Sequence, residues 1–248
     1  MSSVREKLGM LFWIVPLCLQ PLIAFSIGLR RQIRNFPIFF VYTLFVSTRD
    51  LVLLFVRHNA RMYSWIYFLG EPLAILLGVA VIYEILWQLI RQYDTLRALG
   101  MRLFWLSVAV TMLAGLWMFY ESEFGRGEFR MESVVLIERS ARFVQVGVLI
   151  VFILFISHLG LTWKHYTSGI VAGFGVAAGL QLAVFELRST QLIAADTFHL
   201  LNSLGYNVAV LIWAIYFFSP LSEINELGRL PATDLARWDE ILRRYLNQ

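Results

Sequence analysis

A group of charged residues inside a membrane-length apolar segment, Glu132–His158, constrains this chain more than any other feature. The segment carries Glu138, Arg139 and Arg142 ahead of an uninterrupted apolar run. A charge at the centre of a membrane helix costs about 2.5–3.5 kcal/mol on insertion scales, so charges there are usually paired or functional. Helical spacing places Glu138, Arg142 and Gln145 on one face, with Arg139 beside them. We therefore expect this face to point into a helical bundle.

The composition extends this expectation to the whole chain. Of the 248 residues, 59% are hydrophobic and 15% are charged, whereas soluble domains average about 45–50% apolar and about 25% charged residues. A membrane span needs about 20 apolar residues, which leaves room for seven spans joined by short loops. The expected spans are residues 8–29, 37–56, 65–90, 103–119, 132–158, 168–187 and 198–218. The predicted fold is an all-α bundle of seven transmembrane helices.

The predicted transmembrane domain covers residues 1–220, and residues 221–248 form a tail. Within the tail, apolar residues recur at helical spacing between Thr233 and Leu246, with charged residues on the opposite face. This pattern predicts an amphipathic helix. Such a helix can lie on the membrane surface, cap the bundle or bind a cytoplasmic protein partner, and we favour packing on the surface.

Basic residues in the connections predict the orientation. With seven spans, the side that holds the loops after spans one, three and five, together with the tail, carries eleven Lys and Arg residues, and the other side carries seven. Lys and Arg are enriched on the cytoplasmic side of membrane proteins. We therefore expect an outside N-terminus and a cytoplasmic tail, although Arg5 and Lys7 oppose this orientation.

In that orientation, polar residues from several spans fall at one depth, between the middle of the membrane and its outer boundary. Intramembrane ionisable residues are functional by default, and arginines suit a carboxylate or a phosphate through bidentate contacts. The sequence thus predicts an outward-facing polar pocket for a small anion or a lipid, in a receptor-like or ligand-binding protein. No catalytic residue is assigned. The candidate ligand-binding residues are Arg49, Asp50, Glu71, Glu138, Arg139, Arg142, Gln145, His199 and Asn202.

Three alternatives stay open for the same residues. Paired buried ions can lock helices together without any ligand, and removing one partner then destabilises the fold by about 3–5 kcal/mol. A membrane-embedded enzyme acting on lipid or isoprenoid substrates would use Glu71 or Glu138 as acid or base. A small transporter is the third alternative.

Several other chemistries are not supported. A zinc hydrolase needs several histidines around one site, but His58, His158, His165 and His199 are dispersed. A retinal protein needs a lysine for a Schiff base, and the seventh span has none. Phosphate-binding loops, nucleophile elbows and haem-attachment motifs are absent from the sequence. We expect no metal, no cofactor and no nucleic acid, and membrane lipids as the general partners.

Small residues and prolines predict how the helices pack. Two stripes repeat every four residues in the sixth span: Gly169, Gly173 and Ala177, and Gly175 and Gly179. They indicate close packing on two sides of this helix. Pro16 and Pro21 lie inside the first span, where neighbouring groups must satisfy the carbonyls that proline leaves without a donor. The fourth span has no charge and is the best candidate for a lipid-facing helix.

Five segments resemble an acidobacterial-type family of bacterial multi-spanning membrane proteins that has no assigned activity. The segments are Phe36–Tyr42, Val81–Trp87, Leu136–Arg142, Leu159–Trp163 and Tyr206–Trp213. The resemblance covers nearly all the spans. It implies a multi-pass protein of the bacterial inner membrane and supplies no activity, ligand or site residue.

Overall fold

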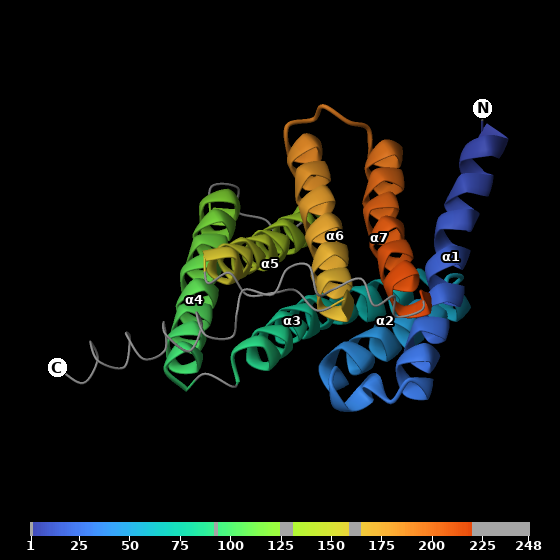
Figure 1. Cartoon of the computed structure of the whole chain (residues 1–248). Helices are drawn as coiled ribbons and strands as arrows, with labels where there is room; N and C mark the ends of the chain where they lie inside the picture. Colours follow the sequence, from blue (N-terminus) through green and yellow to red (C-terminus); the bar gives the residue numbers. More distant parts are fainter. Residues whose placement is uncertain (1, 92–93, 125–130, 159–164, 220–248) are drawn as a thin grey trace.

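The computed structural model describes residues 2–91, 94–124, 131–158 and 165–219. All regular structure in these ranges is helical (Figure 1). The helices are α1 (Ser2–Leu29), the 3-10 helix η1 (Gln32–Arg34), α2 (Pro37–Val56), α3 (Ala60–Ile90), α4 (Asp94–Phe124), α5 (Met131–His158), α6 (His165–Ser189) and α7 (Ala195–Phe218). Each of the seven α-helices contains one of the expected spans.

Six of these helices, namely α1 to α4, α6 and α7, are long and apolar enough to cross a membrane. The protein is therefore a helical, multi-pass integral membrane protein. In α5, the apolar stretch among the described residues is Arg142–Ser157, which is shorter than a typical span. A seventh crossing and the orientation stay predictions. The predicted tail helix, at residues 233–246, lies outside the described residues.

Six helices close into a ring around the core. Helix α1 packs between α2 and α7, α3 joins α2 to α5, and α6 packs between α5 and α7 and also contacts α3. Within the described ranges, α4 packs only against α3 and α5, outside this ring. Only 17% of its candidate span is buried, against 28% to 56% for the other spans. This arrangement fits the expectation that α4 faces lipid.

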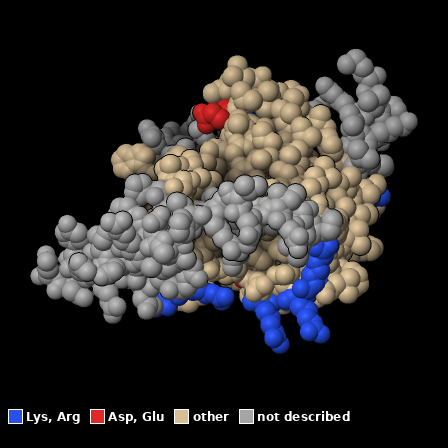
Figure 2. All heavy atoms as spheres, in the orientation of Figure 1, with Lys and Arg blue, Asp and Glu red and all other residues tan. Residues whose placement is uncertain are grey.

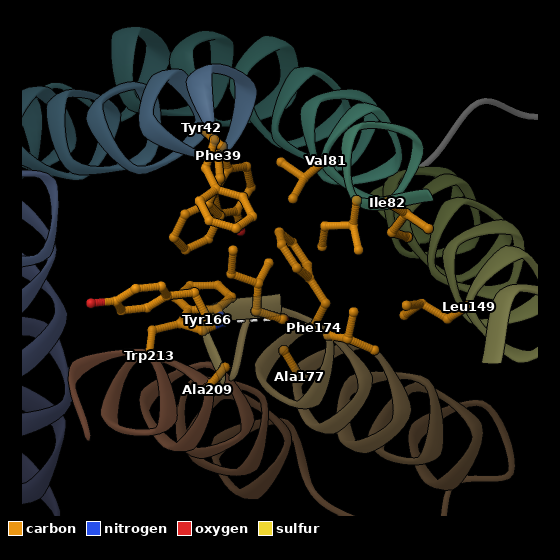
Figure 3. Close-up of a cluster of buried hydrophobic side chains, with 14 of the residues drawn as sticks. Phe39, Tyr42, Val81, Ile82, Leu149, Tyr166, Phe174, Ala177, Ala209 and Trp213 are labelled. Atoms are coloured by element: carbon orange, nitrogen blue, oxygen red, sulfur yellow. Dashed lines mark hydrogen bonds between the residues drawn. The ribbon is translucent and has the colours of Figure 1, made fainter. Parts of the chain in front are cut away.

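Aromatic side chains from α2, α6 and α7 fill the centre of the ring (Figure 3). The ring of Phe39 stacks on Phe217 with centroids 5.5 Å apart and meets Trp213 edge-on at 5.4 Å. Phe174 of α6 lies 5.1 Å from the ring of Trp213. The indole N–H of Trp213 donates to the carbonyl of Ile170 at 3.2 Å, so this buried donor is satisfied.

Glycines on α6 allow α7 to approach closely, as one predicted stripe requires. A Cβ atom on Gly173 would lie 2.7 Å from Cδ1 of Trp213, and one on Gly169 would lie 2.6 Å from Cβ of Tyr216. On the opposite helix, a Cβ atom on Gly205 would lie 3.2 Å from Cβ of Leu180. The prediction of close packing along Gly169 and Gly173 is confirmed.

The second stripe does not pack in this way. A Cβ atom on Gly175 or Gly179 would meet no described atom within 4 Å. Both residues are partly exposed. The prediction of close packing on two sides of α6 is therefore wrong for this side, because the ring presents it outwards.

Polar side chains complete two helix ends. The carboxylate of Glu84 on α3 accepts hydrogen bonds from the backbone N–H groups of Ile38, at 2.8 Å, and Phe39, at 3.0 Å, in the first turn of α2. At the end of α7, Arg30 donates to the carbonyl of Ser219 at 3.2 Å. An acidic group at a helix N-terminus and a basic group at a C-terminus complement the helix dipole.

The carbonyl that Pro16 frees in α1 has a partner. Pro16 has no N–H, so the carbonyl of Phe12, four residues earlier, lacks its helical donor. The side-chain amide of Asn207 on α7 donates to this carbonyl at 3.0 Å, and also to the carbonyl of Ser203 at 2.8 Å. The expectation that a neighbouring group satisfies the freed carbonyl is confirmed for Pro16.

Basic side chains gather along one edge of the molecule (Figure 2). Exposed arginines at the end of the bundle where α1 meets η1 and α3 meets α4 include Arg31, Arg34, Arg91 and Arg102. This is the end that the sequence assigns to the cytoplasm.

Candidate functional site

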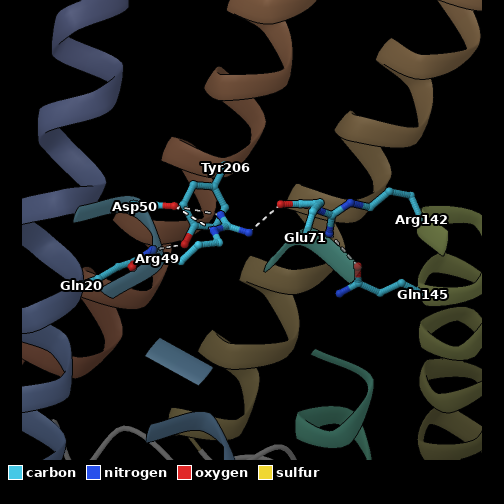
Figure 4. Close-up of polar contacts among 7 residues, drawn as sticks. All are labelled: Gln20, Arg49, Asp50, Glu71, Arg142, Gln145 and Tyr206. Carbon is cyan, nitrogen blue, oxygen red and sulfur yellow. Dashed lines mark hydrogen bonds and ion pairs between the residues drawn. The ribbon is translucent and has the colours of Figure 1, made fainter. Parts of the chain in front are cut away.

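Three charged side chains from three helices meet inside the ring. Glu71 of α3 accepts from Arg49 of α2 through Oε2, at 2.6 Å, and from Arg142 of α5 through Oε1 (Figure 4). Each oxygen of one carboxylate is therefore held by a different arginine. Hydrogen bonds between ionised partners are the strongest in proteins, and guanidinium groups match the geometry of a carboxylate.

Two more side chains extend this ion network. Nε and Nη2 of Arg49 donate to Oδ1 of Asp50 at 3.0 and 2.9 Å, and Nη1 of Arg142 donates to Oε1 of Gln145 at 2.9 Å. We call Arg49, Asp50, Glu71, Arg142 and Gln145 the ion network. Its two arginines balance its two carboxylates, so it places no net charge in the membrane.

Small residues on α3 leave space for the side chains of the ion network. Gly70, Ala74 and Gly78 recur every four residues and share one face of the helix. A Cβ atom on Gly70 would lie 2.6 Å from Cδ of Arg49, and one on Gly78 would lie 2.8 Å from Nε2 of Gln145. These glycines let both side chains cross the surface of α3. The four-residue spacing in the sequence was the signal that could have identified them.

Two buried tyrosines lie beside the arginines. Tyr42 of α2 is 6% exposed and close enough to Arg49 and Arg142 to interact with both charges. Tyr206 of α7 also interacts with Arg49, and its hydroxyl accepts a hydrogen bond from the amide of Gln20 on α1. None of Tyr42, Tyr206 and Gln20 is among the candidate residues that the sequence predicts. A single glutamine inside an apolar span was the available signal for Gln20.

The ion network is not sealed. The side chains of Arg49, Glu71 and Arg142 are each 13% exposed, and that of Asp50 is 23% exposed. Arg49 lies about two turns before the end of α2, and Glu71 and Arg142 lie about three turns into α3 and α5. These three positions are near the same end of the bundle, because consecutive helices alternate in direction. The ion network therefore lies nearer to that end of the bundle than to the other.

Five of the nine predicted site residues thus come together, and they form the ion network. Asn202 on α7 is separate from it, and its buried side-chain oxygen has no hydrogen-bond partner. The side chains of the other three predicted residues lie outside the described part of the structure. These residues, whose helical positions alone are described, are Glu138 and Arg139 on α5 and His199 on α7.

Further side-chain acceptors are buried within the described residues. Four side-chain amide oxygens are buried without a hydrogen-bond donor among the described residues: Gln20 Oε1, Gln181 Oε1, Asn202 Oδ1 and Asn207 Oδ1. Unpaired buried polar groups are rare in native proteins, and each one calls for an explanation. The missing partners are donors, since all four atoms are acceptors.

The described ranges contain no set of side chains suited to bind a metal ion. No group of three or more His, Cys, Asp and Glu side chains there could hold one.

Comparisons with known proteins give no match. Neither a family model, nor a curated protein, nor a solved structure matches the chain. The functional proposal therefore follows from the geometry of the ion network.

Proposed function

We propose that this membrane protein is a receptor-like binding protein whose ligand is a small anion or the anionic head group of a lipid, held between Arg49 and Arg142. The supporting observation is the position of Glu71. Its carboxylate occupies the place between two arginines that a ligand's carboxylate or phosphate would take. In this proposal, Glu71 holds the arginines in place until the ligand displaces it.

The chemistry of the arginines supports this exchange. A guanidinium group stays charged in proteins and presents a planar set of donors that fits carboxylate and phosphate oxygens. Two such groups, supplied by α2 and α5, can hold an anion from two sides. The ligand has to bind the arginines more tightly than Glu71 does. The difference between these two affinities sets how far the ligand shifts the equilibrium from the Glu71-bound to the ligand-bound state.

Access also favours a ligand from one side of the membrane. Arg49 lies about 10 Å from the end of α2, at a rise of 1.5 Å per residue. In the predicted orientation, this end of the bundle is the outer one. A lipid head group of the outer leaflet or a soluble anion would then reach the arginines without crossing the membrane.

The alternative of an enzyme with Glu71 as acid or base has less support. Both oxygens of Glu71 already accept from arginines, so proton transfer would first require the release of at least one of them. The alternative of a purely structural network predicts the same contacts, and only a binding experiment separates it from a ligand site.

The test uses inorganic phosphate and dodecyl phosphate as probes for the purified protein in nanodiscs. Their affinities are measured by thermal shift and by mass spectrometry of the intact protein. Bound probe raises the melting temperature in proportion to the logarithm of its concentration over its Kd. Glu71→Gln weakens the competitor for the arginines, so we expect about tenfold tighter binding of at least one probe.

Two further variants separate specific binding from general attraction. Arg142→Met removes one side of the site and should abolish binding. Arg57→Gln is the matched control, because Arg57 is an exposed arginine at the end of α2 near the network; it should leave binding unchanged. The proposal is wrong if neither the parent protein nor Glu71→Gln binds either probe. It is also wrong if Arg57→Gln weakens binding as much as Arg142→Met does.

A further inference from the structure

The side of Arg49 that faces α1 and α7 is rich in unused acceptors. Both hydrogen bonds from Arg49 to Asp50 end on Oδ1, which leaves Oδ2 available for another donor. Asp50 is also the most exposed member of the ion network, at 23% of its side chain. A carboxylate oxygen in this position suits a cationic donor.

Asn207 supplies a second acceptor, and its orientation is well defined. Its Nδ2 donates to two backbone carbonyls, those of Phe12 and Ser203, so the amide cannot be turned round without losing both bonds. The other amide atom, Oδ1, is therefore an acceptor. Oδ1 is buried and has no hydrogen-bond partner among the described residues, and Asn207 as a whole is only 4% exposed.

Gln20 supplies a third acceptor at the same interface. Phe12, Pro16 and Gln20 follow each other at four-residue spacing, so they share the face of α1 that packs against α7. Gln20 is fully buried, and its Nε2 donates to the hydroxyl of Tyr206. Its Oε1 has no donor in the described structure.

Tyr206 connects these acceptors to the ion network. Figure 4 shows its ring beside Arg49 and Asp50, with its hydroxyl at the amide of Gln20. Asn207 is the next residue on α7. The side chains of Gln20 and Asp50 thus flank Tyr206, on the side of Arg49 away from Arg142, and the unused acceptor of Asn207 belongs to the neighbouring position of the same helix.

We propose that the ligand of this site is a zwitterion, with a primary ammonium group next to its phosphate or carboxylate. This inference rests on the proposed function and adds the chemical class of the ligand. The anionic group lies between Arg49 and Arg142, and the ammonium group lies against the acceptors around Tyr206. A primary ammonium has three N–H donors for these acceptors, and its charge is opposite to that of Asp50. Leaving a buried acceptor unpaired costs about 1–3 kcal/mol, so a ligand that supplies donors gains affinity.

Two ligand pairs test the ammonium group directly. The soluble pair is phosphoethanolamine and phosphocholine, and the lipid pair is phosphatidylethanolamine and phosphatidylcholine in nanodiscs. Within each pair the phosphate and the positive charge are kept, but methylation removes all three N–H donors. We expect the ethanolamine compound to bind about tenfold more tightly or better in at least one pair. The pair that binds identifies a free zwitterion or a lipid head group as the source.

Two variants locate the ammonium group. Gln20→Met removes one acceptor. Asn207→Leu removes another, and it is made in a Pro16→Ala background, where the alanine N–H can satisfy the carbonyl of Phe12. Both should reduce the preference for the ethanolamine compound over the choline compound in the pair that binds.

The outcomes separate this inference from the proposed function. Equal affinity for both members of each pair, lost in Arg142→Met, overturns the ammonium group and leaves the anion site intact; ordered water would then satisfy the acceptors. If Gln20→Met and Asn207→Leu both keep the preference for the ethanolamine compound, the ammonium group does not lie against these two acceptors. If inorganic phosphate, both soluble compounds and both lipids all fail to bind, the proposed function is wrong, and this inference fails with it. Equal affinity within each pair and the failure of every probe are both measured on the parent protein, so the ammonium group and the proposed function can each be overturned even where a variant does not fold.

Discussion

Arg49 crosses α3 directly over Gly70. A Cβ atom on Gly70 would lie 2.6 Å from Cδ and 3.1 Å from Cγ of Arg49. The stem of the arginine therefore uses the space that the missing side chain leaves, and its guanidinium group reaches Glu71 at 2.6 Å from there. The missing side chain at Gly70 thus allows the charge of Arg49 to reach Glu71.

Gly70→Ala should consequently displace Arg49 without disturbing the backbone of α3. The arginine stem is flexible, so it moves away and its contact with Glu71 weakens. We expect the affinity for phosphate to change and the free energy of unfolding to fall by about 1–3 kcal/mol. Gly179→Ala is the control, because a Cβ atom there meets nothing within 4 Å. Unfolding in detergent and phosphate titration measure both effects, and equal behaviour of the two variants would show that Gly70 has no such role.

The packing of α6 was predictable from the sequence only in part. The spacing of Gly169 and Gly173 predicts a close approach, and α7 makes it. Gly175 and Gly179 have the same spacing but face outwards. Spacing along a helix shows which residues share a face, whereas the side on which a neighbouring helix lies depends on how the whole ring closes.

The candidate site shows the same limit. The positions of Arg49, Glu71 and Arg142 at one depth followed from the spans and their directions. The sequence placed Glu138 on the same face as Arg142, because spacing within one helix can be read directly. The carboxylate that Arg142 contacts in the structure is Glu71 of another helix. Similarly, the bond between Gln20 and Tyr206 depends on α1 and α7 lying side by side, which no pattern within either segment specifies.

The two glycines Gly173 and Gly175 provide a matched test of packing on α6. In Gly173→Ala, the new methyl group would overlap the rigid indole of Trp213, which cannot move away without disturbing the core. We expect a loss of about 1–3 kcal/mol in the free energy of unfolding. Gly175→Ala adds the same methyl group in open space and should change stability little. Thermal unfolding in the same detergent compares them, and a larger loss for Gly175→Ala would contradict the arrangement of α6.

The bond from Asn207 to the carbonyl of Phe12 predicts a dependence on Pro16. Asn207→Leu leaves that partly buried carbonyl without a donor and should cost about 1–3 kcal/mol. In a Pro16→Ala background, the backbone N–H of the alanine can donate to the same carbonyl, so Asn207→Leu should cost less. A double-mutant cycle in unfolding free energy measures the difference. Additive effects of the two changes would mean that Asn207 does not compensate for the proline.

The last prediction concerns what the ion network does when no ligand is bound. Arg142→Met removes one of the two arginines and leaves Arg49 with two carboxylates, Asp50 and Glu71. In a network that only stabilises the fold, an uncompensated buried charge costs about 3–5 kcal/mol. Adding Glu71→Gln removes the excess negative charge, so the double variant should recover most of that loss. In an accessible ligand site, water or a proton can compensate the carboxylate, and Arg142→Met should change stability little while probe binding is lost.

Thermal unfolding of both variants, together with mass spectrometry of any co-purified small molecule, separates these cases. A sharp fall in melting temperature that Glu71→Gln reverses, in a parent protein that carries nothing bound, would assign the ion network to folding alone. We expect the other result, because the side chains of Arg49, Glu71 and Arg142 are each 13% exposed, so none of them is fully buried. The unpaired acceptors of Gln20 and Asn207 support the same expectation, since an ion network built only for stability has no need of buried groups without partners.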